Sequence, residues 1–244
     1  MFAGRNISAS HVAFASTRVM ATCAVVGEGV GVAAAFAARE GISPDALAAN
    51  AATLDRIQQH LLREDLFLIG QADRGECSHA HTARITASSE QPDGPAINVI
   101  SGQTRSAQTS RGVRPDRLIA GSHRWMSAPS EPLPAWLEFR WEAPITFSRI
   151  DLTFDSGLQR HLTLTHSDDY LQEMIWSRQP ETVKDFCIET EHEGQWRELE
   201  RVEGNWKRRY RKSLEAPISI TALRITIYAT GGLDHARIVN AAIY

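Results

Sequence analysis

The feature that most constrains the fold is a change in hydrophobic period near Gly70. Before it, apolar residues recur at the spacings of one helical face, and the region is rich in alanine. After it, apolar and polar residues alternate, as in 136–141, 150–154 and 223–228, which is typical of half-buried strands. We therefore expect an α+β multidomain chain in which a short helical piece precedes an antiparallel β-sandwich of the jelly-roll type.

Local signals place the boundaries of these parts. An alanine-rich run over 21–38 predicts one helix that Gly41 ends, and Ser43 before Pro44 predicts the start of another, over 44–63. The polar stretch after Gly70 breaks the helical pattern. We therefore assign residues 1–72 to the helical piece, 73–81 to a linker and 82–244 to the β-sandwich.

Composition is that of a soluble globular protein. Hydrophobic residues make up 43% of the 244 residues and the net charge is −3, so there is no electrostatic reason to expect nucleic acid as a partner. The three cysteines are odd in number and far apart, which excludes a disulfide framework or a CxxC pair. A reducing compartment is compatible with this, and we favour the cytoplasm.

Three short motifs precede the alanine-rich helix: Gly4-Arg5, then Ser10-His11, then Arg18-Val19-Met20. Their order resembles the last cofactor-contacting segment of FAD-dependent oxidoreductases of the glutathione-reductase-like superfamily. In that family the long dinucleotide-binding region precedes this segment, whereas here the resemblance begins at residue 1. The resemblance implies the C-terminal part of an FAD-binding domain, which would bind FAD only together with the missing N-terminal part.

The resemblance also implies which residues meet the cofactor. A helix beginning near Arg18 or Val19 presents unpaired N–H groups and a positive dipole end, which suit a pyrophosphate or a reduced flavin. His11 is the early residue suited to acid–base catalysis, although a structural role as a hydrogen-bonded loop histidine is equally open. The cofactor contacts expected from the resemblance are Gly4, Arg5, Ser16, Arg18, Val19 and Met20.

Three other interpretations of the N-terminal region stay open. The run over 21–38 fits a simple buried helix, and Gly29 to Ala34 matches the end of a GxGxxA dinucleotide fingerprint. Glu40 follows too soon to be the acidic residue of that fingerprint. Arginines before an apolar stretch also outline a secretory signal, but Glu28 interrupts the stretch, and the same residue argues against a membrane span.

The second half resembles the discoidin-like, galactose-binding-domain-like family, an appended β-sandwich module of many enzymes. No single piece is specific, but they follow in the family's order; Ser101 departs from it, standing where many members have an acidic residue. The resemblance implies loops at one end of the sandwich that hold sugars or partner surfaces. The matching pieces are 96–102, 123–127, 136–139, 183–189, 194–196, 204–205 and 236–244.

Two polar runs invite functional readings that we do not favour. Cys77, His79 and His81 have ligand chemistry but lack a fourth partner at a recognisable spacing, so we expect a solvated linker and no metal site. The basic run over 206–212 has interleaved aromatic residues, as in some nucleic-acid surfaces. In a strand its residues would divide between two faces or lie at an edge, which is the interpretation we favour.

Together these observations predict a fragment or subunit of an FAD-dependent oxidoreductase with an appended β-sandwich. Its partners would be a chain that carries the N-terminal FAD-binding half, and carbohydrate. The alternative is a non-catalytic β-sandwich protein that binds carbohydrate or another protein. Exposed aromatic residues clustered in the loops of the sandwich would favour a role in sugar binding.

Overall fold

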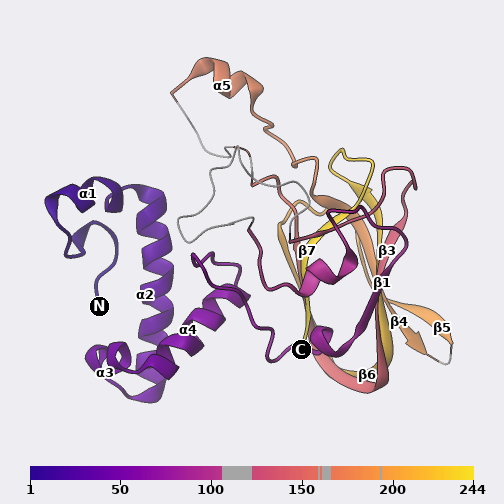
Figure 1. The fold of residues 1–244 in the computed structure, drawn as a ribbon, viewed down its shortest axis with the longest axis horizontal. Coiled ribbons are helices and arrows are strands. Elements are labelled where there is room, and N and C mark those ends of the chain that lie inside the picture. Colours follow the sequence, from indigo (N-terminus) through magenta and orange to yellow (C-terminus); the bar gives the residue numbers. More distant parts are fainter. Residues whose placement is uncertain (106–122, 159, 161–165, 193) are drawn as a thin grey trace. The chain divides into compact units, whose positions relative to one another are not determined.

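The computed structural model describes residues 1–105, 123–158, 160, 166–192 and 194–244. The chain separates into two compact units, Met1–Asp73 and Arg74–Tyr244 (Figure 1). The first unit is helical and the second consists mainly of antiparallel strands, as the change in hydrophobic period predicts.

The helical unit is built around a long helix, α2. Its elements are η1 (Gly4–Asn6), α1 (His11–Thr17), α2 (Met20–Glu40), α3 (Pro44–Ala49) and α4 (Ala51–Arg63). Gly41 ends α2 in the left-handed conformation, with φ of 65°, as expected for a C-terminal glycine. A small core joins α2, α3 and α4 through Ala37, Leu47, Ile57 and Leu61.

The helix predicted over 44–63 is in fact two helices. Asn50 is extended, with φ of −100° and ψ of 99°, and separates α3 from α4. Its side-chain oxygen accepts a hydrogen bond from the backbone N–H of Thr53 at 3.0 Å, so it caps α4. Asparagine competes for backbone hydrogen bonds in this way, which a count of apolar spacing does not detect.

The second unit contains an antiparallel sheet with the strand order β2-β7-β3-β6-β4-β5, and β1 pairs with β3. Figure 1 shows these strands gathered into one body. The elements are η2 (His79–Thr82), β1 (Arg84–Ala87), η3 (Ala96–Ile100), β2 (Trp125–Met126), β3 (Ala135–Phe154), α5 (Asp168–Glu173), β4 (Val183–His192), β5 (Gln195–Val202), β6 (Arg209–Thr230) and β7 (Arg237–Ile243).

Strands β3 and β6 pair along two halves that a register shift between Arg140 and Ile145 separates. Leu137 and Phe139 from the first half of β3 belong to the same buried core as Ile150 and Leu152 from the second half. The bend therefore folds the sheet over on itself as an antiparallel β-sandwich, which confirms the predicted fold class. It also explains how one strand continues past Pro144, where two separate strands were expected.

The segment expected to be a solvated linker packs against the sandwich at its C-terminal end. Ser78 is buried and its hydroxyl accepts a hydrogen bond from the N–H of Ile243 at 3.0 Å. The indole of Trp141 donates to the carbonyl of His79 at 2.9 Å, and Ala80 is buried in the sandwich core. The expectation of a solvated run around Cys77, His79 and His81 is therefore wrong for residues 78–80. These residues are mostly polar, but their backbone groups and small side chains form hydrogen bonds and packing contacts within the sandwich.

Candidate functional site

The N-terminal candidate residues lie around the start of α2. Gly4 has φ of 79° in η1, and η1 packs beside α2. Arg18 follows α1 as its C-terminal cap, Val19 is the extended residue before α2, and Met20 is the first residue of α2. The helix therefore starts within two residues of the predicted position.

The first turn of α2 has no side-chain cap, because Val19 carries no acceptor. Its leading N–H groups are therefore left for solvent or a ligand. Arg18, Val19 and Met20 are all exposed, and Met20 has 88% of its surface accessible. An exposed cation beside uncapped N–H groups is chemically suited to a phosphate or to the anionic edge of a reduced flavin.

The remaining N-terminal candidates are placed differently. His11 is the first residue of α1 and not a loop residue, because the Ser10 hydroxyl accepts from the N–H of Ala13 at 3.3 Å and caps that helix. Within the described residues, no hydrogen bond to the His11 ring is found. Ser16 is exposed inside α1, and Arg5 is exposed in η1.

Helix α2 is mostly exposed or only partly buried, since Ala37 is the one residue of this helix that is buried. Its 21 residues also meet the length and composition criteria of a membrane span, as a signal sequence or the core helix of a soluble protein can. The helical state of Val25 and Val26 removes the strand that a dinucleotide fingerprint at Gly29 would need.

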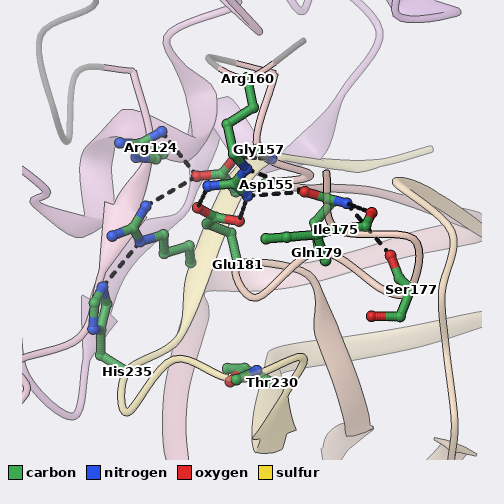
Figure 2. A network of polar contacts seen from close by, with 12 residues as sticks. Arg124, Asp155, Gly157, Arg160, Ile175, Ser177, Gln179, Glu181, Thr230 and His235 are labelled. Atoms are coloured by element: carbon green, nitrogen blue, oxygen red, sulfur yellow. Dashed lines mark hydrogen bonds and ion pairs between the residues drawn. The ribbon is translucent and has the colours of Figure 1, made fainter. Parts of the chain in front are cut away.

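A second candidate site lies where several loops of the sandwich meet (Figure 2). Its centre is Asp155, which follows β3 and is 4% exposed. One carboxylate oxygen accepts from Arg124 at 2.8 Å and from Arg237 at 3.4 Å, and the other accepts from the N–H of Gly157 at 3.0 Å. Burial lowers the pKa of Arg124, and Asp155 opposes that shift.

His235 extends this network by fixing Arg237. The Arg237 Nε can only donate, so His235 Nε2, 2.9 Å away, is the acceptor. His235 Nδ1 then carries the proton and donates to Asp234 at 2.7 Å, and this hydrogen bond lowers the pKa of Asp234. The network thus requires a neutral histidine of one tautomer.

Arg160 forms the other half of the network. It pairs with both carboxylate oxygens of the buried Glu181 and donates to the side-chain oxygen of Gln179 at 3.0 and 3.2 Å. Gly157 has φ of 68°, and a β-carbon there would lie 2.2 Å from the Arg160 guanidinium. The left-handed backbone at this turn therefore favours a glycine, and a larger residue would also displace the Arg160 guanidinium.

The basic run over 206–212 divides between two sides of β6. Arg211 makes a two-point pair with Asp151 at 2.9 and 2.8 Å, and Arg209 lies 3.7 Å from the same carboxylate. Tyr210 and Lys212 instead bond to Glu200 of β5. Within residues 209–212 the side chains therefore divide between the two faces of the strand, which is one of the two arrangements expected for this run.

Four tryptophans of the sandwich have two different roles. Trp125 and Trp141 are buried in the sandwich, whereas Trp136 and Trp196 flank the Arg224 guanidinium, which lies 4.8 and 4.0 Å from their ring centres.

Among the described residues, no group of three or more His, Cys, Asp or Glu side chains is placed to hold a metal ion.

Sequence reasoning missed the Asp155 network. Arg124 and Arg237 fall in segments recognised as matching pieces, but their shared partner could not be identified, because the chain brings them together only through the folded sheet. The available signal was the sequence Asp155-Ser156-Gly157 directly after a strand, which marks a tight turn with an acidic side chain.

Comparison with known proteins finds different relatives for the two units. The family model described as FAD dependent oxidoreductase matches residues 1–61, which confirms the predicted resemblance of this segment. The match covers less than half of the chain. No curated protein sequence matches the chain.

Several solved carbohydrate-binding modules are similar to this chain. The family 32 module of Clostridium perfringens NanJ, solved with galactose, is 15% identical, with a TM-score of 0.45, and 67% of this chain and 94% of that chain are covered. The module of Streptococcus pneumoniae EndoD is 18% identical, with 66% and 94% covered and a TM-score of 0.45. A chitosan-binding module from Paenibacillus sp. IK-5 is 13% identical, with 68% and 98% covered and a TM-score of 0.45. At this similarity, the assignment of the β-sandwich rests on the strand pairing itself.

Proposed function

We propose that this chain works as part of an FAD-dependent oxidoreductase, in which residues 1–61 supply one wall of the flavin site. The observation that carries the proposal is the family match over these residues. The uncapped start of α2 beside the exposed Arg18 is consistent with it, because such a helix end favours an anion. Gly4, Arg5, Ser16, Arg18, Val19 and Met20 are the proposed FAD contacts.

The flavin site needs a further domain beside residues 1–61. Residues 1–73 form helices and contain no strand, so this unit has no strand-turn-helix that could cradle a pyrophosphate. We infer that a further dinucleotide-binding domain, outside residues 1–244, supplies that element. FAD would then bind between the two, and the chain alone would hold it weakly.

The flavin proposal is tested by reversing the charge at Arg18. In the assembly purified from the native host, Arg18→Glu is expected to reduce the bound flavin, because it replaces a cation with an anion at the proposed contact. Arg39→Glu, at the other end of α2, is the matched control and should leave flavin content unchanged. Equal flavin content in Arg18→Glu and the wild type would contradict the proposal.

We place His11 in an acid–base role at that site, since it is an exposed imidazole at the start of α1, the helix that also carries the proposed contact Ser16. His11→Gln is expected to slow flavin reduction in the assembly without loss of flavin. Rapid-mixing absorbance measurements of flavin reduction test this role. An unchanged rate of flavin reduction would contradict the acid–base role of His11.

The second candidate function is carbohydrate binding by the sandwich. The observation that favours it is the loop end of the sandwich, where ion pairs to the buried Asp155 and Glu181 hold the polar side chains of Arg124 and Arg160 in place. The sugars named for the similar modules define a first panel of probes: galactose and chitosan oligosaccharides. Calorimetric titration of the full chain with this panel tests the function, and absence of binding at millimolar sugar would contradict it.

A further inference from the structure

The turn between β6 and β7 is held against the segment that precedes β4 by main-chain hydrogen bonds. The N–H of Gly231 donates to the carbonyl of Thr182 at 2.8 Å, and the N–H of Leu233 donates to the carbonyl of Pro180 at 3.2 Å. The Glu181 carboxylate of the same segment pairs with Arg160 in the network already described. The position of the turn is therefore coupled to the loop end of the sandwich.

His235 lies at the end of this turn, and its side chain is 9% exposed. Its Nε2 accepts from the Arg237 Nε at 2.9 Å, and its Nδ1 donates to Asp234 at 2.7 Å. Arg237 also reaches the buried Asp155 at 3.4 Å, so this arginine bridges the histidine and the centre of the network (Figure 2). The imidazole thus connects the turn to Asp155 through one hydrogen bond.

The charged groups around His235 decide what an added proton would do. The network surrounds it with the cations Arg124, Arg160 and Arg237 and the carboxylates Asp155, Glu181 and Asp234. Of these, Arg237 and Asp234 contact the imidazole directly. The Asp234 side chain is 69% exposed, so water screens its attraction, whereas the Arg237 side chain is 17% exposed and its repulsion is screened less.

A second proton on the imidazole would break its contact with Arg237. An imidazolium donates from both ring nitrogens, and the Arg237 Nε can only donate, so two N–H groups would face each other across 2.9 Å. The two side chains would also carry like charges in a mostly buried place. The contact with Asp234 survives the proton, and the charged ring is expected to move toward solvent with that exposed residue.

We propose that His235 is an acid-sensitive latch of the β6–β7 turn. When a proton from solvent binds at Nε2, the hydrogen bond from Arg237 breaks, the imidazolium keeps Asp234, and the turn over residues 231–235 separates from residues 179–182. At neutral pH the latch is closed and the turn is held as the structure shows. The latch consists of contacts within the sandwich, so the inference depends on neither proposed function.

The direct test is nuclear magnetic resonance of the full chain from about pH 8 to about pH 5, the range in which a histidine side chain ordinarily changes its charge. At neutral pH we expect the His235 ring to carry its proton on Nδ1 alone. The Arg237 Nε–H signal should lose its hydrogen-bonded shift as Nε2 gains a proton. If this signal keeps its shift through that change, or if Nε2 gains no proton down to about pH 5, the latch is contradicted.

Amide exchange in the same samples reports the opening of the turn. After correction for the intrinsic effect of pH, exchange at Gly231 and Leu233 should rise by up to about tenfold per pH unit on acidification, because the opening takes up one proton. The N–H of Ala236 donates to the buried hydroxyl of Ser127 at 2.9 Å and should stay protected, which separates a local opening from unfolding of the sandwich.

His235→Gln is the matched variant, because its amide oxygen can accept from Arg237 but cannot gain a proton in this range. Exchange at Gly231 should then be equally slow at both ends of the range. His166→Gln, which replaces an exposed histidine outside the network, should open on acidification as the wild type does. Equal acid dependence in the wild type and His235→Gln would assign the opening to another group and overturn the proposal.

Discussion

Asp155 is a buried carboxylate that pairs with two arginines, so its replacement is expected to lower the free energy of unfolding. Asp155→Asn would remove the charged partner that Arg124 and Arg237 share, and their side chains are only 14% and 17% exposed. The loss of one partner from a buried pair costs about 3–5 kcal/mol of unfolding free energy. Urea unfolding should show a loss of this size, and the exposed Glu142→Gln should show almost none. A loss below about 1 kcal/mol would contradict the buried-pair account.

Cys187 is a second residue whose environment predicts its chemistry. Burial raises the pKa of its thiol to about 12, with Glu189 and Glu198 adding to the shift. The thiolate is the reactive form, so at pH 8 a thiol reagent should modify the exposed Cys77 and leave Cys187 unmodified in the folded chain. Mass spectrometry after a brief exposure to the reagent reads this out, with the guanidinium-unfolded chain as control. Rapid modification of Cys187 in the folded state would show that the reagent reaches this thiol, which would contradict its burial in β4.

Among the elements, the break at Asn50 decides the shape of the helical unit. Asn50→Ala removes the cap of α4 and is expected to cost about 1 kcal/mol, whereas Asn50→Ser retains an acceptor and should cost less. Chemical denaturation followed by helical circular dichroism measures both. If the alanine variant is as stable as the wild type, the cap does not limit the stability of this unit.

The side-chain contacts between β5 and the start of β6 have a pH dependence that follows from Glu200. The hydrogen bond from Lys212, with a further one from Tyr210, lowers the pKa of Glu200. A lowered carboxyl pKa means that the stabilisation is full above the pKa of the unfolded chain and is lost as the pH falls through the folded value. The stability difference between the wild type and Glu200→Gln should therefore be present at neutral pH and shrink below about pH 4. A difference independent of pH would assign the effect to packing.

At the scale of the molecule, periodicity predicted the two kinds of unit because burial on one face imposes it on each element. It failed at Asn50 and at Pro144, where one residue or a short shift of register alters the path without altering the apolar pattern. The Asp155 network could not be predicted either, since its members are far apart in the chain and meet only through the strand order. At the N-terminus the order of short motifs identified the flavin-related segment, which depends on sequence similarity and not on a pattern of burial.

The central claim is that residues 1–61 form part of a flavin site that a further domain completes. The most direct measurement is the flavin absorbance of the tagged full chain purified from its native host, with each fraction resolved by size. We predict flavin in the fraction where this chain is bound to a second polypeptide, and little in the fraction of the chain alone. Stoichiometric flavin on the chain alone would contradict the need for a further domain, and the absence of flavin from every fraction would contradict the flavin site itself.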